Sequence, residues 1–460
     1  MKSQKRIYAL LLALAMVAAA CGGDDEGTGD SAAAGDAGGE LAGEVVNVFG
    51  AFVDADAAAF DATVADFEAE TGIDVVYEGS GDFETQVGIR IEGGNPPDIA
   101  MFPQPGLWAN FIDGMVDFDA LGVDTGQMRS DLSDYLVELP GQVAESTGNA
   151  RDGVFGGWFR LNTKSWLWIP VPEFEEAGYA IPETWDDLLA LQEQIKADGN
   201  TPWCFGMESA GATGWVATDW MEDMVLRTGG TEVYDQWVFH EIPFNDPQIA
   251  NAAERLGEVI FPEGNVLGGT AAILATPFGD QNTPMFDDPP ACYLAKQAGF
   301  ITGFFPGQDT PDDPSDDVFG PNAPQQETQA IPFPRIDNDQ DVLLGAGDLF
   351  GVFSDRPAVA ETVKFLLTPD GGAGFARAQA GYLSPNSQFD TSNYLDPFQQ
   401  QQGELLATAL AANGFRFDAS DLMPASVGAG TFWTAMVDYV QNGPDNLSDV
   451  LSDIESSWPS

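Results

Sequence analysis

Short apolar runs alternate with amphipathic segments in the first part of the chain. Three apolar runs are short enough to be buried strands, at 45–49, 73–77 and 99–102. Phe60, Val64 and Phe67 recur at helical spacing between the first two runs, and Gly72 predicts the end of that helix. A second helix is predicted at 83–91. This order of strands and helices indicates a parallel sheet with crossover helices, and hence an α/β fold.

The loops that follow these strands are the predicted place for a ligand. In open α/β sheets, ligands bind beyond the carboxyl ends of the strands. Phe52, Asp82 and Gln104 follow the three predicted strands, and Gln104 stands between two prolines that restrict its backbone. We therefore expect these three side chains near a binding site.

Helical spacing also recurs through the rest of the chain. Thr184 and Asp187 match a capping box at the start of a helix, with Leu188, Leu191 and Ile195 as its apolar stripe. Further helices are predicted at 215–227, 247–260, 358–367, 371–379, 402–413 and 432–442. The sequence contains no internal repeat and no nucleotide-phosphate loop.

The first residues have the pattern of a targeting segment. Basic residues precede the apolar run 7–20, which is too short for a stable membrane-spanning helix. Small residues before Cys21 resemble the lipobox of bacterial lipoproteins, although Ala18 stands where leucine is usual. We predict a signal peptide at 1–20 and a disordered, Gly- and Asp-rich tether at 21–43, with lipid on Cys21. Ordinary secretion is the alternative, and both interpretations place the protein outside the cytoplasm.

Charge narrows the range of partners. Asp and Glu number 73 against 17 Lys and Arg, which gives a formal net charge of -56. Such a surface repels nucleic acid and anionic lipid, so we expect no nucleic-acid partner. The acids are scattered along the chain, which favours solubility outside the cell as their role, and we expect a monomer. With 460 residues, two lobes are expected rather than one core.

Several short motifs together resemble one protein family. Glu-Thr-Gly-Ile at 70–73 and Gly-Gly-Asn-Pro-Pro-Asp at 93–98, behind the tether, are similar to the family 1 extracellular solute-binding proteins. These are receptors of ABC-type importers, related to maltose-binding protein. Further runs resemble the α-glucoside-binding branch of that family, at 102–106, 156–160, 203–206, 213–220 and 345–348.

The resemblance implies a two-lobe periplasmic-binding-protein-like fold with a hinge and an interlobe ligand cleft. Lobe 1 would comprise 44–158 and 349–395, and lobe 2 would comprise 159–348 and 396–460. An α-glucoside or related oligosaccharide would be trapped by hinge closure, and a membrane-embedded ABC permease would recognise the closed form. We expect no catalysis, no cofactor and no metal.

Sugar recognition requires aromatic rings against pyranose faces and polar groups for hydroxyls. Trp215 and Asp219 would share one helical face, unless Trp215 only packs the helix start and Asp219 is solvated. Arg160 lies among apolar residues and needs either a ligand or a structural salt bridge. Asp348 can accept from hydroxyls or cap a turn. Trp433 lies where the family often supplies a stacking aromatic, although plain helix packing is the alternative.

Several other functions compete with sugar binding. A secreted glycoside hydrolase would also use aromatics and a carboxylate pair, but the sequence has no Gly-x-Ser-x-Gly elbow and only His240 for histidine chemistry. The same fold binding a polyamine or another small solute would suit the acidic charge, whereas a purely structural lipoprotein would not need a hinge.

In an exported chain, Cys204 and Cys292 favour one disulfide. Ser209 and Trp108 are weaker candidates for ligand contact.

Overall fold

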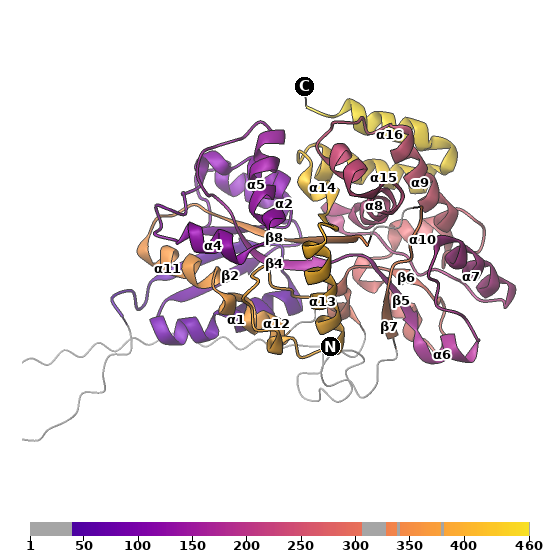
Figure 1. Ribbon diagram of the computed structural model, residues 1–460, viewed down its shortest axis with the longest axis horizontal. Helices are drawn as coiled ribbons and strands as arrows, with labels where there is room; N and C mark the ends of the chain where they lie inside the picture. The colour runs from indigo at the N-terminus through magenta and orange to yellow at the C-terminus, as the bar shows by residue number, and fades with distance from the viewer. Residues whose placement is uncertain (1–38, 306–327, 338–340, 379–380, 460) are drawn as a thin grey trace, which may run out of the picture. The chain divides into compact units, whose positions relative to one another are not determined.

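The computed structural model describes residues 39–305, 328–337, 341–378 and 381–459 (Figure 1). The predicted signal peptide, Cys21 and most of the predicted tether therefore lie outside the described residues. Within the described ranges, every helix is either too short or too polar to cross a membrane.

The larger sheet is built on the first three predicted strands. Its strand order is β2-β1-β3-β8-β4, and β9 pairs with β8. The strands are β1 (Val45–Gly50), β2 (Asp74–Gly79), β3 (Ile99–Phe102), β4 (Gly157–Thr163), β8 (Leu343–Val352) and β9 (Phe415–Phe417). β1 runs parallel to both β2 and β3, as the sequence predicts. β8 enters between β3 and β4 and is antiparallel to both, an arrangement that periodicity alone does not reveal.

The two predicted crossover helices are present. They are α1 (Asp54–Thr71) and α2 (Phe83–Glu92). Gly72 ends α1 in the left-handed conformation, with φ 72°, and its N–H donates to the carbonyl of Glu68. Phe60 and Val64 face the core, so the helical stripe seen in the sequence is the buried face.

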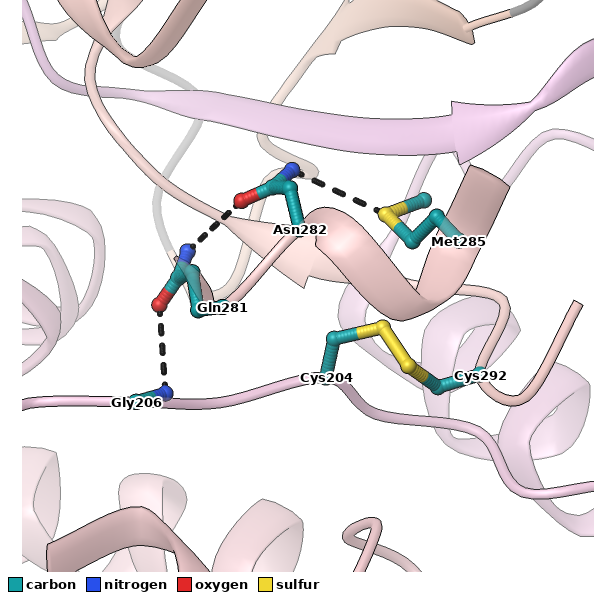
Figure 2. Close-up of a disulfide and its surroundings, with 6 residues drawn as sticks. All are labelled: Cys204, Gly206, Gln281, Asn282, Met285 and Cys292. Atoms are coloured by element: carbon teal, nitrogen blue, oxygen red, sulfur yellow. Dashed lines mark hydrogen bonds between the residues drawn. A yellow bond between two sulfur atoms is a disulfide. The ribbon is translucent and has the colours of Figure 1, made fainter. Parts of the chain in front are cut away.

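A smaller antiparallel sheet has the order β6-β5-β7, formed by β6 (Ala295–Lys296), β5 (Trp166–Pro170) and β7 (Thr328–Pro332). Cys204 and Cys292 form the predicted disulfide nearby, with their Cα atoms 5.4 Å apart. Figure 2 shows Gln281 beside this bond: its side chain accepts from the Gly206 N–H at 3.3 Å and donates to Asn282 at 3.1 Å. The disulfide thus holds the segment that leads into Ser209.

The remaining helices agree in most places with the sequence pattern. The capping box of Thr184 and Asp187 is formed at the start of α7. α8 extends beyond the predicted 215–227, and its backbone leaves helical geometry at Gly230. The helices are α3 (Pro105–Ala109), α4 (Thr125–Asp131), α5 (Asp134–Ser146), α6 (Val171–Glu176), α7 (Trp185–Ala197), α8 (Trp215–Val238), α9 (Pro247–Ile260), α10 (Gly269–Ala275), α11 (Pro357–Leu366), α12 (Ala373–Ala378), α13 (Pro397–Ala411), α14 (Ala419–Leu422), α15 (Trp433–Asn442) and α16 (Leu447–Ser456).

β4 and β8 are far apart in the sequence and lie side by side in the larger sheet (Figure 1). Arg160 of β4 is paired in register with Asp348 of β8. Because side chains alternate along a strand, Arg160, Asn162 and Lys164 emerge on the same face. A Cβ on Gly347 would lie 2.3 Å from the Arg160 carbonyl oxygen, so the close approach of the two strands requires glycine there.

Candidate ligand-binding cleft

A cavity of about 240 Å³ lies where the β1, β2 and β3 ends meet β4, β8, the start of α8 and α14. All the ligand-binding candidates from the sequence line it except Asp82, and the weaker candidate Ser209 lines it as well. Asp82 is exposed at the start of α2, while its neighbours Ser80, Gly81 and Glu84 reach the cavity. Trp108 is buried away from the cavity. The strand-end loops thus meet at one place, as the topology predicts.

Arg160 is buried and held by two carboxylates. Its Nε donates to Asp348 at 2.8 Å, and its Nη1 donates to Asp56 at 3.0 Å. Burial alone would lower the pKa of Arg160, but the two carboxylates raise it above the ordinary value. The guanidinium also lies over the Phe52 ring, 4.4 Å from its centroid. Arg160 is therefore a structural ion-pair partner and a cavity-lining cation at once.

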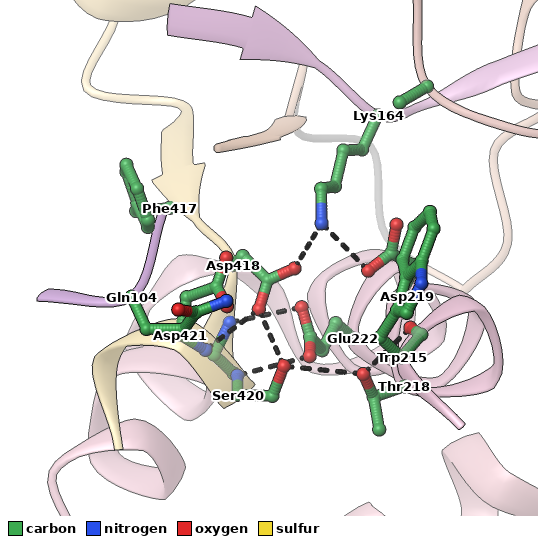
Figure 3. A network of polar contacts seen from close by, with 12 residues as sticks. Gln104, Lys164, Trp215, Thr218, Asp219, Glu222, Phe417, Asp418, Ser420 and Asp421 are labelled. Atoms are coloured by element: carbon green, nitrogen blue, oxygen red, sulfur yellow. Dashed lines mark hydrogen bonds and ion pairs between the residues drawn. The ribbon is translucent and has the colours of Figure 1, made fainter. Parts of the chain in front are cut away.

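Lys164 is a cleft residue that the sequence analysis missed. Its Nζ lies 2.8 Å from Asp219 Oδ1 and 2.5 Å from Asp418 Oδ2 (Figure 3). Burial opposes the charge of Lys164, yet the carboxylates raise its pKa well above the ordinary value. The period of two from Arg160 through Asn162 was the signal available in the sequence. Its partners lie 55 and 254 residues away, and no local pattern indicates them.

Asp418 and Glu222 fix the first turn of α14. Asp418 Oδ1 accepts from the Ser420 hydroxyl at 2.8 Å and from the Asp421 N–H at 2.9 Å. Glu222 accepts from the N–H groups of Ala419 at 3.0 Å and Ser420 at 3.1 Å. Burial raises the pKa of Glu222 well above its ordinary value. For Asp418, burial is outweighed by Lys164 and by its hydrogen bonds, so its pKa lies below the ordinary value.

Carboxylate oxygens of Asp219, Glu222 and Asp418 lie within 4.8 Å of one another, a grouping that a metal ion could use. The Lys164 ammonium already contacts two of these three groups and supplies a cation there. Burial raises the pKa of Asp219 to about 7 although Lys164 opposes the rise. The cluster therefore balances its charge with a lysine and with protons.

One side of the cavity is aromatic. Trp215, Phe278, Phe300 and Phe304, named here the aromatic wall, all line it. The Trp215 and Phe278 rings lie 5.1 Å apart, and the Phe278 and Phe304 rings lie 5.2 Å apart. Phe304 is 39% exposed, which is high for a large apolar side chain at a cavity. Flat rings with an accessible face suit the apolar face of a sugar ring.

The start of α8 places Trp215 in this wall. Gly214 precedes it with φ 118°, a conformation that favours glycine. A Cβ at Gly214 would lie 2.2 Å from the Trp433 carbonyl oxygen, so the α8 start packs directly against α15. Trp433 is buried at the cavity, and its Nε1 donates to the Ser420 hydroxyl at 3.4 Å. Asp219 lies one helical turn after Trp215 and lines the same cavity, as predicted from their spacing.

Two buried amide oxygens at the cavity have no hydrogen-bond donor among the described residues. They are Gln104 Oε1 and Asn162 Oδ1. The carboxylates that line the cavity also outnumber its cations, which are Arg160 and Lys164. Such a lining accepts hydrogen bonds from a ligand and repels an anion. Its chemistry fits a neutral ligand that is rich in hydroxyl groups and has an apolar face.

The chain matches a known protein family and two relatives over most of its length. Residues 53–373 match the family model described as bacterial extracellular solute-binding protein. The osmoprotective compounds-binding protein GgtB of Synechocystis sp. is 39% identical over 415 residues, covering 90% of this chain and 92% of that protein. The alpha-glucosides-binding periplasmic protein AglE of Rhizobium meliloti is 38% identical over 425 residues, covering 92% of this chain and 88% of that protein.

Solved structures share the fold at lower identity. The bacterial solute receptor AcbH, described as preferring β-D-galactopyranose, has a TM-score of 0.70 and 14% identity, and the match covers 90% of this chain and 98% of that one. Maltose-bound MalE3 of T. maritima has a TM-score of 0.63 and 14% identity, covering 90% of this chain and 98% of that one. At this identity the likeness concerns the fold alone.

Proposed function

The chain belongs to the bacterial extracellular solute-binding proteins, the substrate-binding proteins of ABC sugar transporters, and on this premise we propose that its cargo is a compact α-glucoside. The family and the two-lobe α/β fold were predicted from the sequence, and the comparisons confirm both. The protein is a binding protein outside the cytoplasm and not an enzyme, because its relatives over nearly the whole chain are solute-binding proteins.

The observation that carries the proposal is the composition of the cavity. The aromatic wall offers faces for a pyranose ring, and the carboxylates that line the cavity offer acceptors for hydroxyl groups. The name of the relative AglE supports an α-glucoside, and the name of GgtB supports a related osmoprotective compound. Both names are consistent with a small, neutral, hydroxyl-rich ligand.

The size of the cavity favours a short ligand. Its volume of about 240 Å³ lies just below the roughly 300–1,000 Å³ that is typical of ligand pockets. A disaccharide or a glucosylated polyol fits this scale better than a long α-glucan. We therefore propose that the ligand is short.

Transport would follow the family scheme. We propose that lobe 1 (44–158 and 349–395) and lobe 2 (159–348 and 396–460) close around the sugar, and that the ABC permease recognises this closed form. A lipid on Cys21 would keep the monomeric receptor at the membrane surface, with 21–43 as its tether.

A polyamine is the competing cargo within the same fold. The excess of carboxylates in the cavity favours a cation, but Arg160 and Lys164 place two fixed positive charges beside any ligand. Those cations and the aromatic wall favour a neutral sugar over a polycation. A thermal-shift screen that includes spermidine distinguishes the two ligands.

A thermal-shift screen of the full chain tests the proposal. Maltose, trehalose, sucrose, longer α-glucans and spermidine would each be added, since a ligand that binds only the folded state raises the melting temperature. We expect a rise with a short α-glucoside, which is then recovered unchanged. A rise with spermidine alone would contradict the sugar assignment. Release of free glucose would contradict the assignment as a binding protein.

A further inference from the structure

Two rings of the aromatic wall come from one short turn. Phe300 and Phe304 both lie in the 3₁₀ turn Gly299–Phe304, here called the wall turn, and both line the cavity. Between them, Ile301 is fully buried in the small apolar cluster that also contains the disulfide. One face of the turn therefore meets the ligand cavity and the other meets the protein interior. The position of the two rings depends on what holds this turn.

The first residue of the wall turn packs against a buried glutamine. A Cβ on Gly299 would lie 1.9 Å from Gln402 Oε1, so the Gln402 amide occupies the place that a side chain at 299 would need. The φ of Gly299 is not positive, so this contact and not the backbone requires glycine. Gln402 belongs to α13 and is completely buried. It does not line the cavity, so it can affect a ligand only through the residues that it contacts.

A chain of hydrogen bonds fixes the orientation of this amide. Trp166 Nε1 donates to the Thr163 hydroxyl at 2.6 Å, and that hydroxyl donates to Gln402 Oε1 at 2.7 Å. Because an indole nitrogen can only donate, the single proton of the hydroxyl is left for Gln402. Thr163 is the last residue of β4, the strand that also carries Arg160 at the cavity. The amide oxygen against which Gly299 packs is therefore held from β4.

A second contact holds the next residue of the wall turn. A Cβ on Gly381 would lie 2.8 Å from both the Cα and the Cβ of Phe300, so the backbone at 381 lies directly against the base of that side chain. Two residues later, Leu383 exchanges backbone hydrogen bonds of 2.8 and 2.9 Å with Leu161 of β4. The wall turn is thus held at two successive residues by segments that are hydrogen-bonded to β4.

We propose that Gln402 is a positioning residue for sugar binding, which sets the Phe300 ring through its contact with Gly299. This inference rests on the proposed function as a sugar receptor. Packing of a ring on a pyranose face depends on ring placement, since a gap of about 0.5–1 Å already forfeits a quarter to a half of the dispersion attraction. A residue outside the cavity then sets the affinity for a sugar that it does not touch.

Reciprocal substitutions at this contact test the inference. The full chain, Gly299→Ala, Gln402→Ala and the double variant would be titrated by calorimetry with the tightest binder among maltose, trehalose and sucrose. We expect Gly299→Ala, whose methyl group collides with the amide, to bind about 10-fold more weakly, the scale of one ring contact. Gln402→Ala removes the support and should also weaken binding. In the double variant the methyl group takes the place of the amide oxygen, so this protein should bind more tightly than either single variant.

Removal of the ring gives a second readout, which a residue with only a structural role would not change. In a Phe300→Ala background, Gly299→Ala has no ring left to displace, so it should weaken the remaining sugar binding by less than about 2-fold. Its melting temperature should still fall, because the collision with Gln402 remains.

Two substitutions serve as matched controls. Gln401→Ala changes the exposed neighbour of Gln402 on α13, and Gly141→Ala adds a methyl group in α5 that meets no atom within 4 Å. Both variants should keep the sugar affinity of the wild type.

The outcomes separate the inference from the proposed function. If the wild type binds a sugar and the losses of the two single variants add in the double variant, the inference is overturned and the proposed function stands. The same holds if Gly299→Ala weakens binding equally with and without the Phe300 ring, or if Gln402→Ala binds like the wild type. Should Gly299→Ala fail to fold, the comparison of Gln402→Ala with the double variant still decides. If the wild type binds none of the sugars, both proposals fail.

Discussion

Each buried cation of the cleft is held by two carboxylates. Lys164 contacts Asp219 and Asp418, and Arg160 contacts Asp56 and Asp348. Pairing of this kind offsets the cost of burying charge and fixes the side chains before a ligand arrives. The geometry of the cavity is therefore set by these ion pairs as much as by apolar packing.

Lys164→Met tests how much this pairing contributes to stability. Removing the ammonium leaves two buried carboxylates facing each other, so we expect a loss of about 3–5 kcal/mol in the free energy of unfolding. Lys364→Met is the matched control, because Lys364 forms an exposed pair with Glu361 that is worth about 0–1 kcal/mol. Urea unfolding at pH 7 measures both. Equal losses in the two variants would show that the buried network is not structural.

The buried carboxylates also predict how stability depends on pH. Burial raises the pKa of Asp219 to about 7, and it raises the pKa of Glu222 and Asp421 in the same direction. The unfolded chain releases these protons near pH 4, so the contribution of each group is full below that pH and is lost as the pH rises through its folded pKa. Asp418 acts in the opposite sense, but only below its ordinary pKa.

We therefore expect the melting temperature to fall as the pH is raised from about 5 to 8, because the free energy of unfolding decreases by up to about 1.4 kcal/mol per pH unit for each proton involved. Asp219→Asn should flatten this slope because it removes one of the titrating groups. The exposed substitution Asp445→Asn should leave the slope unchanged. A melting temperature that rises between pH 5 and 8 would contradict the direction of these pKa shifts.

Candidate residues could be predicted where a local sequence pattern indicates their position. Helical spacing predicted that Trp215 and Asp219 share one face, the place of Gln104 after a strand predicted its position, and all three line the cavity. Their contact with a ligand stays a prediction. Lys164 and Asp421 were missed because their roles depend on contacts with distant segments. Asp82 was chosen by the same strand-end rule as Gln104, but its side chain is exposed and Glu84, two residues later, reaches the cavity.

At the scale of elements, the start of α8 is the feature that sets the aromatic wall. Gly214 allows Trp215 to begin the helix against the Trp433 carbonyl. Gly214→Ala would both strain a backbone with φ 118° and place a methyl group 2.2 Å from that oxygen. We expect a loss of stability above the about 1–2 kcal/mol that positive φ alone costs, together with weaker sugar binding.

Gly178→Ala is the control for this prediction. Gly178 also has positive φ, at 69°, but a Cβ there meets no atom within 4 Å. Its alanine variant should lose only about 1–2 kcal/mol and keep its sugar affinity. Denaturant unfolding and calorimetric titration measure the two effects, and equal losses in both variants would exclude a special role for the contact with Trp433.

Sequence periodicity predicted the elements better than their arrangement. The parallel β1, β2 and β3 and the crossover helices follow from spacing over neighbouring residues. The insertion of β8 between β3 and β4 joins segments nearly 190 residues apart, as the Arg160 and Asp348 pair shows. Pairing at that distance depends on the whole fold and leaves no local signal.

At the scale of the whole molecule, the formal net charge of -56 is the dominant physical property. Self-repulsion among so many acids destabilises the compact state, and salt screens it over about 10 Å at 0.1 M. We expect the melting temperature to rise between about 20 mM and 1 M NaCl. Glycerol solutions of the same osmolality serve as the control. A melting temperature that falls or stays constant with salt would contradict this account.

The family resemblance supplied the two-lobe organisation that spacing could not. Short Gly- and Pro-containing runs identified the family, and the relatives confirm it over nearly the whole chain. The lobe boundaries, the lipid on Cys21 and the monomeric state stay predictions.

Calorimetric titration of the full chain with maltose and with cellobiose tests the assignment as an α-glucoside receptor. These disaccharides have the same composition and differ only in the anomeric configuration of their linkage. We expect saturable binding of maltose and at least tenfold weaker binding of cellobiose, a difference of about 1.4 kcal/mol or more. Equal affinities, or binding of cellobiose alone, would contradict the assignment as an α-glucoside receptor.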